Sequence, residues 1–236
     1  MPEPQAACED EAREALAAAA GALCAGRGRP GAGGPASLSL RWRRSGGEGF
    51  LAVAASAWEP ATDAEAVDWF TLEPSPGPES DGHLDDTAQS GSHLDRRLHR
   101  DLYRQLPETS AVVSWRPVFS TTLACLAAIQ REGIPTFHPD VAVAAGGAIR
   151  CARKAAANSP ALSDHVLAAL QDRRACLLAG RGLLVIGRTL PAALGLSAEI
   201  ESLAQIYCEV LRLSGRSSDS ADSADDADSA AAGGAG

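Results

Sequence analysis

The chain has 236 residues, a net charge of −9 and an apolar content dominated by alanine, a composition typical of one ordinary domain with flanking segments. The negative charge argues against a nucleic-acid or anionic-membrane partner, because neutralising phosphates requires clustered Lys and Arg. No apolar run reaches the roughly 18 residues of a membrane-spanning helix, and the N-terminal region is acidic where a secretory signal would be basic, so we expect a cytoplasmic protein.

The N-terminal third is predicted to contain one helix followed by strands. The segment 9–24 is rich in alanine and is ended by Gly26, which predicts an opening helix. Alternation of apolar and polar residues predicts half-buried strands at 37–42 and 49–55, with a possible third strand at 67–72. The surrounding stretch is rich in Pro, Gly, Asp and Ser, and we expect residues 75–90 to form a mobile loop.

The remainder of the chain alternates between helical and strand patterns. Helical spacing of apolar residues predicts four helices, at 95–106, 120–130, 163–172 and 190–213. Short apolar runs predict strands at 110–117, at 141–145, and as a pair within 175–186 that is interrupted at Gly180-Arg181-Gly182. Strands that alternate with helices predict an α/β protein in which helices cover a sheet.

The last residues differ in composition from the rest. Residues 216–236 consist almost wholly of Ser, Asp, Ala and Gly, which cannot bury enough apolar area to offset the entropy of an ordered chain. We therefore expect one domain over 1–215 and a disordered acidic tail over 216–236.

The six cysteines are far apart and contain no Cys-x-x-Cys pair, which predicts buried, reduced thiols and no metal or redox centre. Cys151 is the alternative to this interpretation, because the neighbouring Arg150, Arg153 and Lys154 would lower its pKa.

Three segments carry a pattern shared with a known family. They are His99-x-x-x-Tyr103-x-x-x-Pro107, the apolar run 110–117 that follows it, and Glu201-x-x-x-Gln205-Ile206-Tyr207. Together they resemble the class II aldolase/adducin family. The resemblance implies a three-layer α/β/α sandwich with a central mixed sheet, and a homo-oligomer, commonly a cyclic tetramer with sites at subunit interfaces.

The resemblance also shows where this chain departs from the family. Family members have a His-x-His pair at the end of the first apolar run, which corresponds to 110–117 here, and Asn-His-Gly in a second run, which corresponds to 176–187, and these histidines hold zinc. Here the corresponding residues are Ser114, Arg116 and Arg181. A guanidinium offers no lone pair and a serine hydroxyl is a poor zinc ligand, so we expect no bound metal and no cofactor.

Other family positions are altered as well. Ser37 stands where the family has a phosphate-contacting asparagine, and Ser56 lies in a segment that has lost the glycine of the phosphate loop. Asp95 stands where the family has its acid/base glutamate. These changes argue against a phosphorylated sugar as the substrate.

Two functions remain open from these residues. In the first, Arg116, Arg181 and Asp95 form an internal salt-bridge cluster in a non-catalytic binding or scaffold module. In the second, Arg116 and Arg181 hold a small carboxylate or hydroxycarbonyl compound while Asp95 moves a proton, which gives a metal-independent lyase, decarboxylase or isomerase. Ser114, Ser37 and Ser56 are further candidates for contacts to a small anionic ligand.

Other residues suggest chemistry that we set aside. The combination of His93, Asp95 and His99 suggests a metal site, but a surface cluster is the preferred interpretation. His138 is expected to be a packed loop residue, and Trp115 to face the core on the opposite side of its strand from Ser114. The chain contains no Gly-x-Ser-x-Gly pentapeptide and no complete dinucleotide or P-loop motif, which argues against serine-hydrolase and nucleotide chemistry.

Overall fold

The computed structural model describes residues 8–24, 36–55, 63–73 and 95–231, of which Ala55 and 215–231 are described by their backbone alone. The expected mobile loop at 75–90 and the candidate Ser56 lie outside the described residues.

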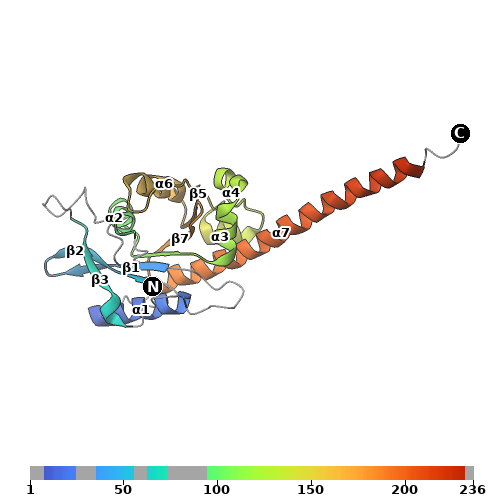
Figure 1. The fold of residues 1–236 in the computed structure, drawn as a ribbon. Coiled ribbons are helices and arrows are strands. Elements are labelled where there is room, and N and C mark those ends of the chain that lie inside the picture. The colour runs from blue at the N-terminus through green and yellow to red at the C-terminus, as the bar shows by residue number, and fades with distance from the viewer. Residues whose placement is uncertain (1–7, 25–35, 56–62, 74–94, 232–236) are drawn as a thin grey trace.

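A mixed sheet forms the centre of the molecule (Figure 1). The described residues give it seven strands in the order β3-β2-β1-β4-β7-β6-β5, and every neighbouring pair is antiparallel except β5 with β6. The strands are β1 Ala36–Arg44, β2 Gly47–Ala55, β3 Asp68–Thr71, β4 Ala111–Trp115, β5 Cys151–Ala152, β6 Ala175–Leu178 and β7 Gly182–Gly187. Strands distant in the chain, β1 and β4, are therefore neighbours at the middle of the sheet.

Helices cover both faces of this sheet, as expected for a three-layer α/β/α sandwich (Figure 1). One layer holds α1, α3, α4, α5 and α7, and the other holds α2 and α6. The helices are α1 Glu9–Cys24, α2 Arg96–Gln105, α3 Val118–Cys125, α4 Ala127–Glu132, α5 Pro139–Ala145, α6 Pro160–Leu170 and α7 Leu190–Ala231, with a 3₁₀ turn η1 at Ala64–Ala66.

The alternation of side chains along each strand separates two cores. Leu38 of β1, Val113 of β4 and Leu183 of β7 face the layer that contains α1 and α7. Val112 and Leu184 face the layer that contains α2 and α6. Because successive side chains point to opposite faces, a strand in the middle of the sheet supplies residues to both cores.

Two sequence predictions in the middle of the chain are wrong. The segment 141–145 is not a strand but the end of α5, which His138 caps through a bond from Asp140 N to His138 Nδ1 of 3.3 Å, and which ends at Gly146 in the left-handed region. The predicted helix at 120–130 is instead two short helices, α3 and α4, separated at Leu126, whose extended backbone breaks the helical hydrogen bonding. His138 is an exposed cap, not a packed loop residue.

The last helix extends well beyond the sandwich (Figure 1). α7 runs from Leu190 to Ala231 and so crosses residue 215, where we expected the domain to end. Disorder of the acidic tail in solution stays a prediction. No helix in the described part of the chain combines the length and the apolar character needed to cross a bilayer.

Candidate functional site

A small pocket lies at the end of the central strands. Its lining includes Ser37 of β1, together with Ser114, Trp115 and Arg116 at the end of β4 and Arg181 of the β6–β7 turn. Ser37 and Ser114 face each other directly, because they are paired in the register of β1 with β4. Four of the predicted site residues are thus brought together by a strand pairing that joins distant parts of the chain. The pocket has a volume of about 20 Å³, which is room for a single water molecule.

Arg181 forms a buried ion pair with the fifth candidate, Asp95. Arg181 Nη2 donates to Asp95 Oδ2, and the Asp95 side chain is only 6% exposed. Asp95 also precedes α2 as its N-terminal cap residue, and its Oδ1 accepts a hydrogen bond of 3.1 Å from the backbone N–H of Asn158. The carboxylate therefore connects the β6–β7 turn, α2 and the segment before α6.

The two guanidiniums of the pocket differ in their surroundings. Arg116 is exposed, and no hydrogen bond or ion pair holds its side chain among the residues that the structure describes. Arg181 is mostly buried, and its Nη1 is out of contact with solvent and has no hydrogen-bond partner within the described ranges. A buried donor without a partner is costly, so this atom marks a place where an acceptor would bind favourably.

The donor set does not fit the zinc that the family resemblance implies. Catalytic zinc takes nitrogen, sulfur or carboxylate ligands, whereas this pocket offers two guanidiniums and two hydroxyls. Three or more His, Cys, Asp or Glu side chains grouped to hold a metal are not found in the described part of the chain. The chemistry that these side chains support is recognition of an anion, because they supply positive charge and hydrogen-bond donors.

A chain of buried polar groups leads from the pocket into the sandwich. Ser37 Oγ lies 3.1 Å from His99 Nε2, and Ser39 Oγ lies 2.6 Å from His99 Nδ1. Ser39 Oγ also lies 2.7 Å from the hydroxyl of Tyr103. Ser37 and Ser39 are two apart on β1 and His99 and Tyr103 are four apart on α2, so each pair shares one face of its element.

His99 is completely buried, so the prediction of a surface histidine cluster is wrong for this residue. Burial lowers the pKa of His99 to about 4, although the nearby carboxylate of Asp95 acts in the opposite direction. Burial likewise raises the pKa of the Tyr103 phenol. Both groups are therefore neutral near pH 7. The sequence spacing indicates that the two serines share one face of their strand and that His99 and Tyr103 share one face of their helix. It does not indicate that these two faces pack against each other.

Glu201 is a second buried carboxylate near the pocket and was not among the predicted site residues. Its Oε1 accepts from Phe119 N at 2.7 Å, and its Oε2 accepts from Ser120 N at 2.9 Å and from Ser120 Oγ at 2.7 Å. These atoms belong to the first turn of α3, which follows Arg116 closely, so α7 fixes the start of α3. Burial raises the pKa of Glu201 above its ordinary value.

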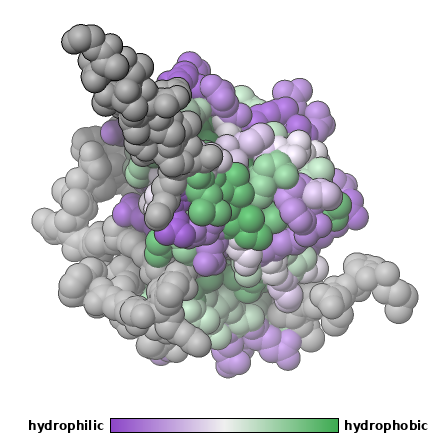
Figure 2. All heavy atoms as spheres, turned by 90° about the vertical axis from the view of Figure 1, so that its right-hand side faces the viewer, coloured by the Kyte–Doolittle hydropathy of each residue, from purple (hydrophilic) through white to green (hydrophobic). Residues whose placement is uncertain are grey.

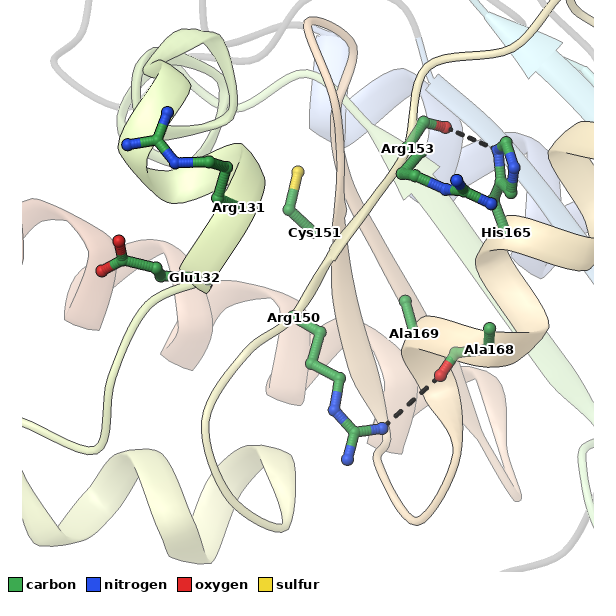
Figure 3. Close-up of a pocket in the computed structure, with 9 residues that line it drawn as sticks. Arg131, Glu132, Arg150, Cys151, Arg153, His165, Ala168 and Ala169 are labelled. Carbon is green, nitrogen blue, oxygen red and sulfur yellow. Dashed lines mark hydrogen bonds between the residues drawn. The ribbon is translucent and has the colours of Figure 1, made fainter.

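A larger hollow of about 270 Å³ lies away from this pocket, between α4, β5 and α6 (Figure 3). Cys151 stands at its centre, while the side chains of Arg131, Arg150 and Arg153 extend outward around it. The guanidinium of Arg150 is bonded to the backbone of Gln171 at 2.9 Å. Burial raises the pKa of Cys151 to about 11, so the alternative of an activated thiol is wrong.

Trp115 lies where the strand alternation places it. It is 8% exposed and packs in the core on the α1 and α7 side, as predicted. Its Nε1 is buried without a hydrogen-bond partner among the described residues.

The sheet with helices on both faces, and the pocket at the ends of its central strands, define the molecule as a three-layer α/β/α protein. The family model for the Class II Aldolase and Adducin N-terminal domain matches residues 14–208, which is most of the chain. The chain therefore belongs to this family.

Curated relatives match over part of their length. The 5-methylthioribulose-1-phosphate/5-deoxyribulose-1-phosphate aldolase of Rhodospirillum rubrum is 43% identical over 118 residues, which are 50% of this chain and 52% of the relative. The L-fuculose phosphate aldolase of Escherichia coli K12 is 36% identical over 118 residues, 50% of this chain and 53% of the relative. The aligned part of the chain thus spans about half the length of these relatives.

Solved structures share the fold over a longer stretch. An L-fuculose 1-phosphate aldolase superimposes with a TM-score of 0.65 at 18% identity, over 87% of this chain and 89% of the other. The L-fuculose-1-phosphate aldolase of Thermus thermophilus gives a TM-score of 0.60 at 22% identity, over 86% of this chain and 97% of the other. At these identities the likeness concerns the fold alone.

Proposed function

We propose that this domain is a metal-independent, non-catalytic member of the class II aldolase/adducin family that binds a small anion between Arg116 and Arg181. The observation that carries the proposal is the buried Nη1 of Arg181, which has no hydrogen-bond partner among the described residues and belongs to a side chain that lines the pocket with a second guanidinium, Ser37 and Ser114. An oxyanion would accept from these groups, and paired guanidiniums bind carboxylates and phosphates in a forked geometry.

The surroundings of Asp95 support a binding role without catalysis. Its two oxygens are engaged by Arg181 and by the backbone of Asn158, so the carboxylate holds two segments together. A general base needs an oxygen directed at the proton that it removes. Asp95 therefore acts as the anchor of Arg181 in this proposal.

The pocket must widen to take a ligand. Its volume of about 20 Å³ holds one water, whereas a carboxylate or phosphate group is several times larger. Arg116 is exposed, and no side chain of the described ranges holds it, so its movement is the simplest way to make room. The relatives are named for aldolase activity on sugar phosphates, which makes inorganic phosphate and small carboxylates the first ligands to test.

The test combines metal analysis with ligand binding. Elemental analysis of the purified full chain is expected to find no stoichiometric zinc, iron or manganese. A thermal-shift series with phosphate and small carboxylates is expected to raise the melting temperature, and Arg116→Ala and Arg181→Ala are expected to abolish the rise. Arg188→Ala is the matched control, because Arg188 is an exposed arginine outside the pocket. Stoichiometric metal, or a shift that survives both pocket variants, would contradict the proposal.

The second candidate is a metal-independent lyase, decarboxylase or isomerase in which Asp95 moves a proton. The identity of 43% and 36% to relatives named as aldolases favours it. Incubation of the chain with L-fuculose 1-phosphate and 5-methylthioribulose 1-phosphate, with and without added zinc, tests this candidate. Turnover that is lost in Asp95→Asn would replace the binding proposal, while no turnover under any condition leaves the binding proposal in place.

We further propose that the domain forms a homo-oligomer, with a tetramer as the expected state, and that it is cytoplasmic. Figure 2 shows hydrophobic surface on the face from which α7 projects. Ile206, Val210 and Leu213 of α7 are 47%, 42% and 61% exposed, and burial of such a stripe would stabilise an assembly. Light scattering on the full chain is expected to give a multiple of 24.2 kDa, reduced by Val210→Glu and unchanged by Gln205→Glu. Fractionation of cells that express the chain tests its location.

A further inference from the structure

The buried polar chain has one open end and one closed end. Ser37 lines the pocket, whereas Tyr103, at the other end, is 1% exposed and Ser39 is completely buried. The hydroxyl of Tyr103 is bonded to Ser39 Oγ and to no other side chain within the described ranges. A hydrogen-bond chain that is closed at one end constrains the direction of every proton in it, because each buried donor needs an acceptor.

The protons can be followed outward from the closed end. The backbone of Val112 also bonds the Tyr103 hydroxyl and favours its ionised form, so it acts as a donor to the phenol oxygen. Among the described residues this leaves Ser39 Oγ as the acceptor for the phenol proton, so Tyr103 donates to Ser39. Ser39 then donates its own proton to His99 Nδ1, which must be the unprotonated ring nitrogen. The ring proton is therefore on Nε2, and His99 donates it to Ser37 Oγ.

The opposite direction is unfavourable. If Ser37 donated to Nε2, then Nδ1–H would donate to Ser39, and Ser39 would donate to the Tyr103 oxygen. The phenol proton would then be buried without an acceptor, which corresponds to a roughly 5- to 150-fold preference for the first direction. Because Ser37 accepts from His99, its own O–H has no acceptor along the chain and is available on the pocket side.

We propose that His99 is a positioning residue which, held as its Nε2–H tautomer by Ser39 and Tyr103, fixes Ser37 as a hydrogen-bond donor to the oxyanion in the pocket. The ligand half of this inference rests on the proposed function, but the tautomer does not. Donors at Ser37, Arg116 and Arg181 together select a group that only accepts, such as a carboxylate or a phosphate, over a hydroxyl or an amide. The pocket recognises its ligand partly through a residue that does not touch it.

The tautomer is read directly by NMR on the full chain labelled with ¹⁵N-histidine. One-bond coupling is expected between a proton and Nε2 of His99, and none at Nδ1, in the absence of any ligand. The spectrum of His99→Gln assigns the signal by its loss. A proton on Nδ1 would overturn the inference whatever the ligand does.

The coupling to the pocket is measured with inorganic phosphate by calorimetry. Ser37→Ala is expected to weaken binding about 5- to 10-fold, since a hydrogen bond to a charged group is lost. His99→Leu is expected to weaken binding by a similar factor, and His99→Gln to restore most of it, because a side-chain amide can both accept from Ser39 and donate to Ser37. Recovery by Gln but not by Leu separates positioning from a general packing role.

Ser163→Ala is the matched control. Ser163 is a buried serine of α6, in the same layer as the helix α2 that carries His99, and its Oγ has no hydrogen-bond partner among the described residues. It is expected to leave phosphate binding unchanged. Equal binding by the unchanged chain and by Ser37→Ala would overturn the inference while the proposed function stands. No phosphate or carboxylate binding by the unchanged chain would overturn the proposed function and the ligand half of the inference, and the NMR result would still decide the tautomer.

Discussion

The two faces of the central sheet are built from the same strands but differ in chemistry. On the face toward α1 and α7, β1 contributes Leu38 and Leu40 to an apolar core. On the face toward α2 the same strand contributes Ser37 and Ser39, which are buried but bonded to His99. A shift of one residue along β1 therefore separates side chains that stabilise the fold by exclusion of water from side chains that must find specific partners.

This difference shows how the fold supports a site. Apolar burial is non-directional and tolerates small movements, and the larger of the two apolar cores lies on the α1 and α7 face. Buried polar groups are favourable only in one geometry, since an unmade hydrogen bond is costly. The polar face therefore holds Ser37, His99 and Asp95 in fixed orientations beside the pocket.

The largest expected effect is on the apolar face. Leu38→Ala removes a completely buried side chain and is expected to lower the free energy of unfolding by about 2–5 kcal/mol, through lost burial and the cavity left behind. Urea denaturation measures this. Leu126→Ala is the control, because Leu126 is 42% exposed. An equally large loss of unfolding free energy in this variant would show that burial on the apolar face is not the cause of the effect.

The polar face is expected to make stability depend on pH. Because the pKa of His99 is lowered from 6.5 to about 4, the unfolded chain takes up a proton below pH 6.5 that the folded chain does not. The contribution of neutral His99 to the free energy of unfolding is therefore complete above pH 6.5 and is lost as the pH falls to about 4. We expect the free energy of unfolding to decrease by roughly 2–3 kcal/mol between pH 7 and pH 4.5.

Denaturation of the unchanged chain and of His99→Gln at both pH values isolates this contribution from that of the carboxylates. The variant is expected to lose less stability on acidification. Parallel losses in the two proteins would show that His99 does not titrate in this way.

A smaller effect is expected at the buried ion pair. Asp95→Asn keeps the shape of the side chain but removes its charge, which leaves the mostly buried Arg181 without its partner. We expect a loss of about 1–2 kcal/mol, below the value for a fully buried pair because Arg181 is 26% exposed. Thermal denaturation measures the change, and increased stability would indicate that the pair is strained and held for binding.

The smallest effect is expected at the exposed pair of Arg188 with Glu108, whose side chains are 81% and 82% exposed. Arg188→Ala is expected to change stability by less than about 0.5 kcal/mol, because solvent screens this pair. Added salt should remove even that difference. If Arg188→Ala lowered stability as much as Asp95→Asn does, burial would not explain the different stabilities that the two ion pairs contribute.

Much of the fold could be predicted from the sequence because its elements carry strong local signals. The alanine-rich α1 and the strands around Arg181 lie where periodicity placed them. The prediction for 141–145 was wrong because Val and Ala alternate there, while Pro139 at the helix start and Gly146 after its end were the stronger signals.

Residues of the site could be predicted only where they lie on one strand or in a motif shared with the family. Ser114, Arg116 and Arg181 were found from the altered motifs, and the structure brings them together with Ser37. The roles of these residues stay predictions. The buried position of His99 could not be found, since it depends on how α2 packs across β1.

One glycine sets how closely the main-chain segments that carry the two arginines of the pocket approach each other. Gly182 has a φ of +132°, and a Cβ at this position would lie 2.4 Å from the carbonyl oxygen of Trp115. The turn that bears Arg181 therefore touches the main chain next to Arg116. The separation of the two main-chain segments is consequently fixed by this contact. Movement of the Arg116 side chain can change the distance between the two guanidiniums, but the segments that carry them can move apart only by giving up the contact at Gly182.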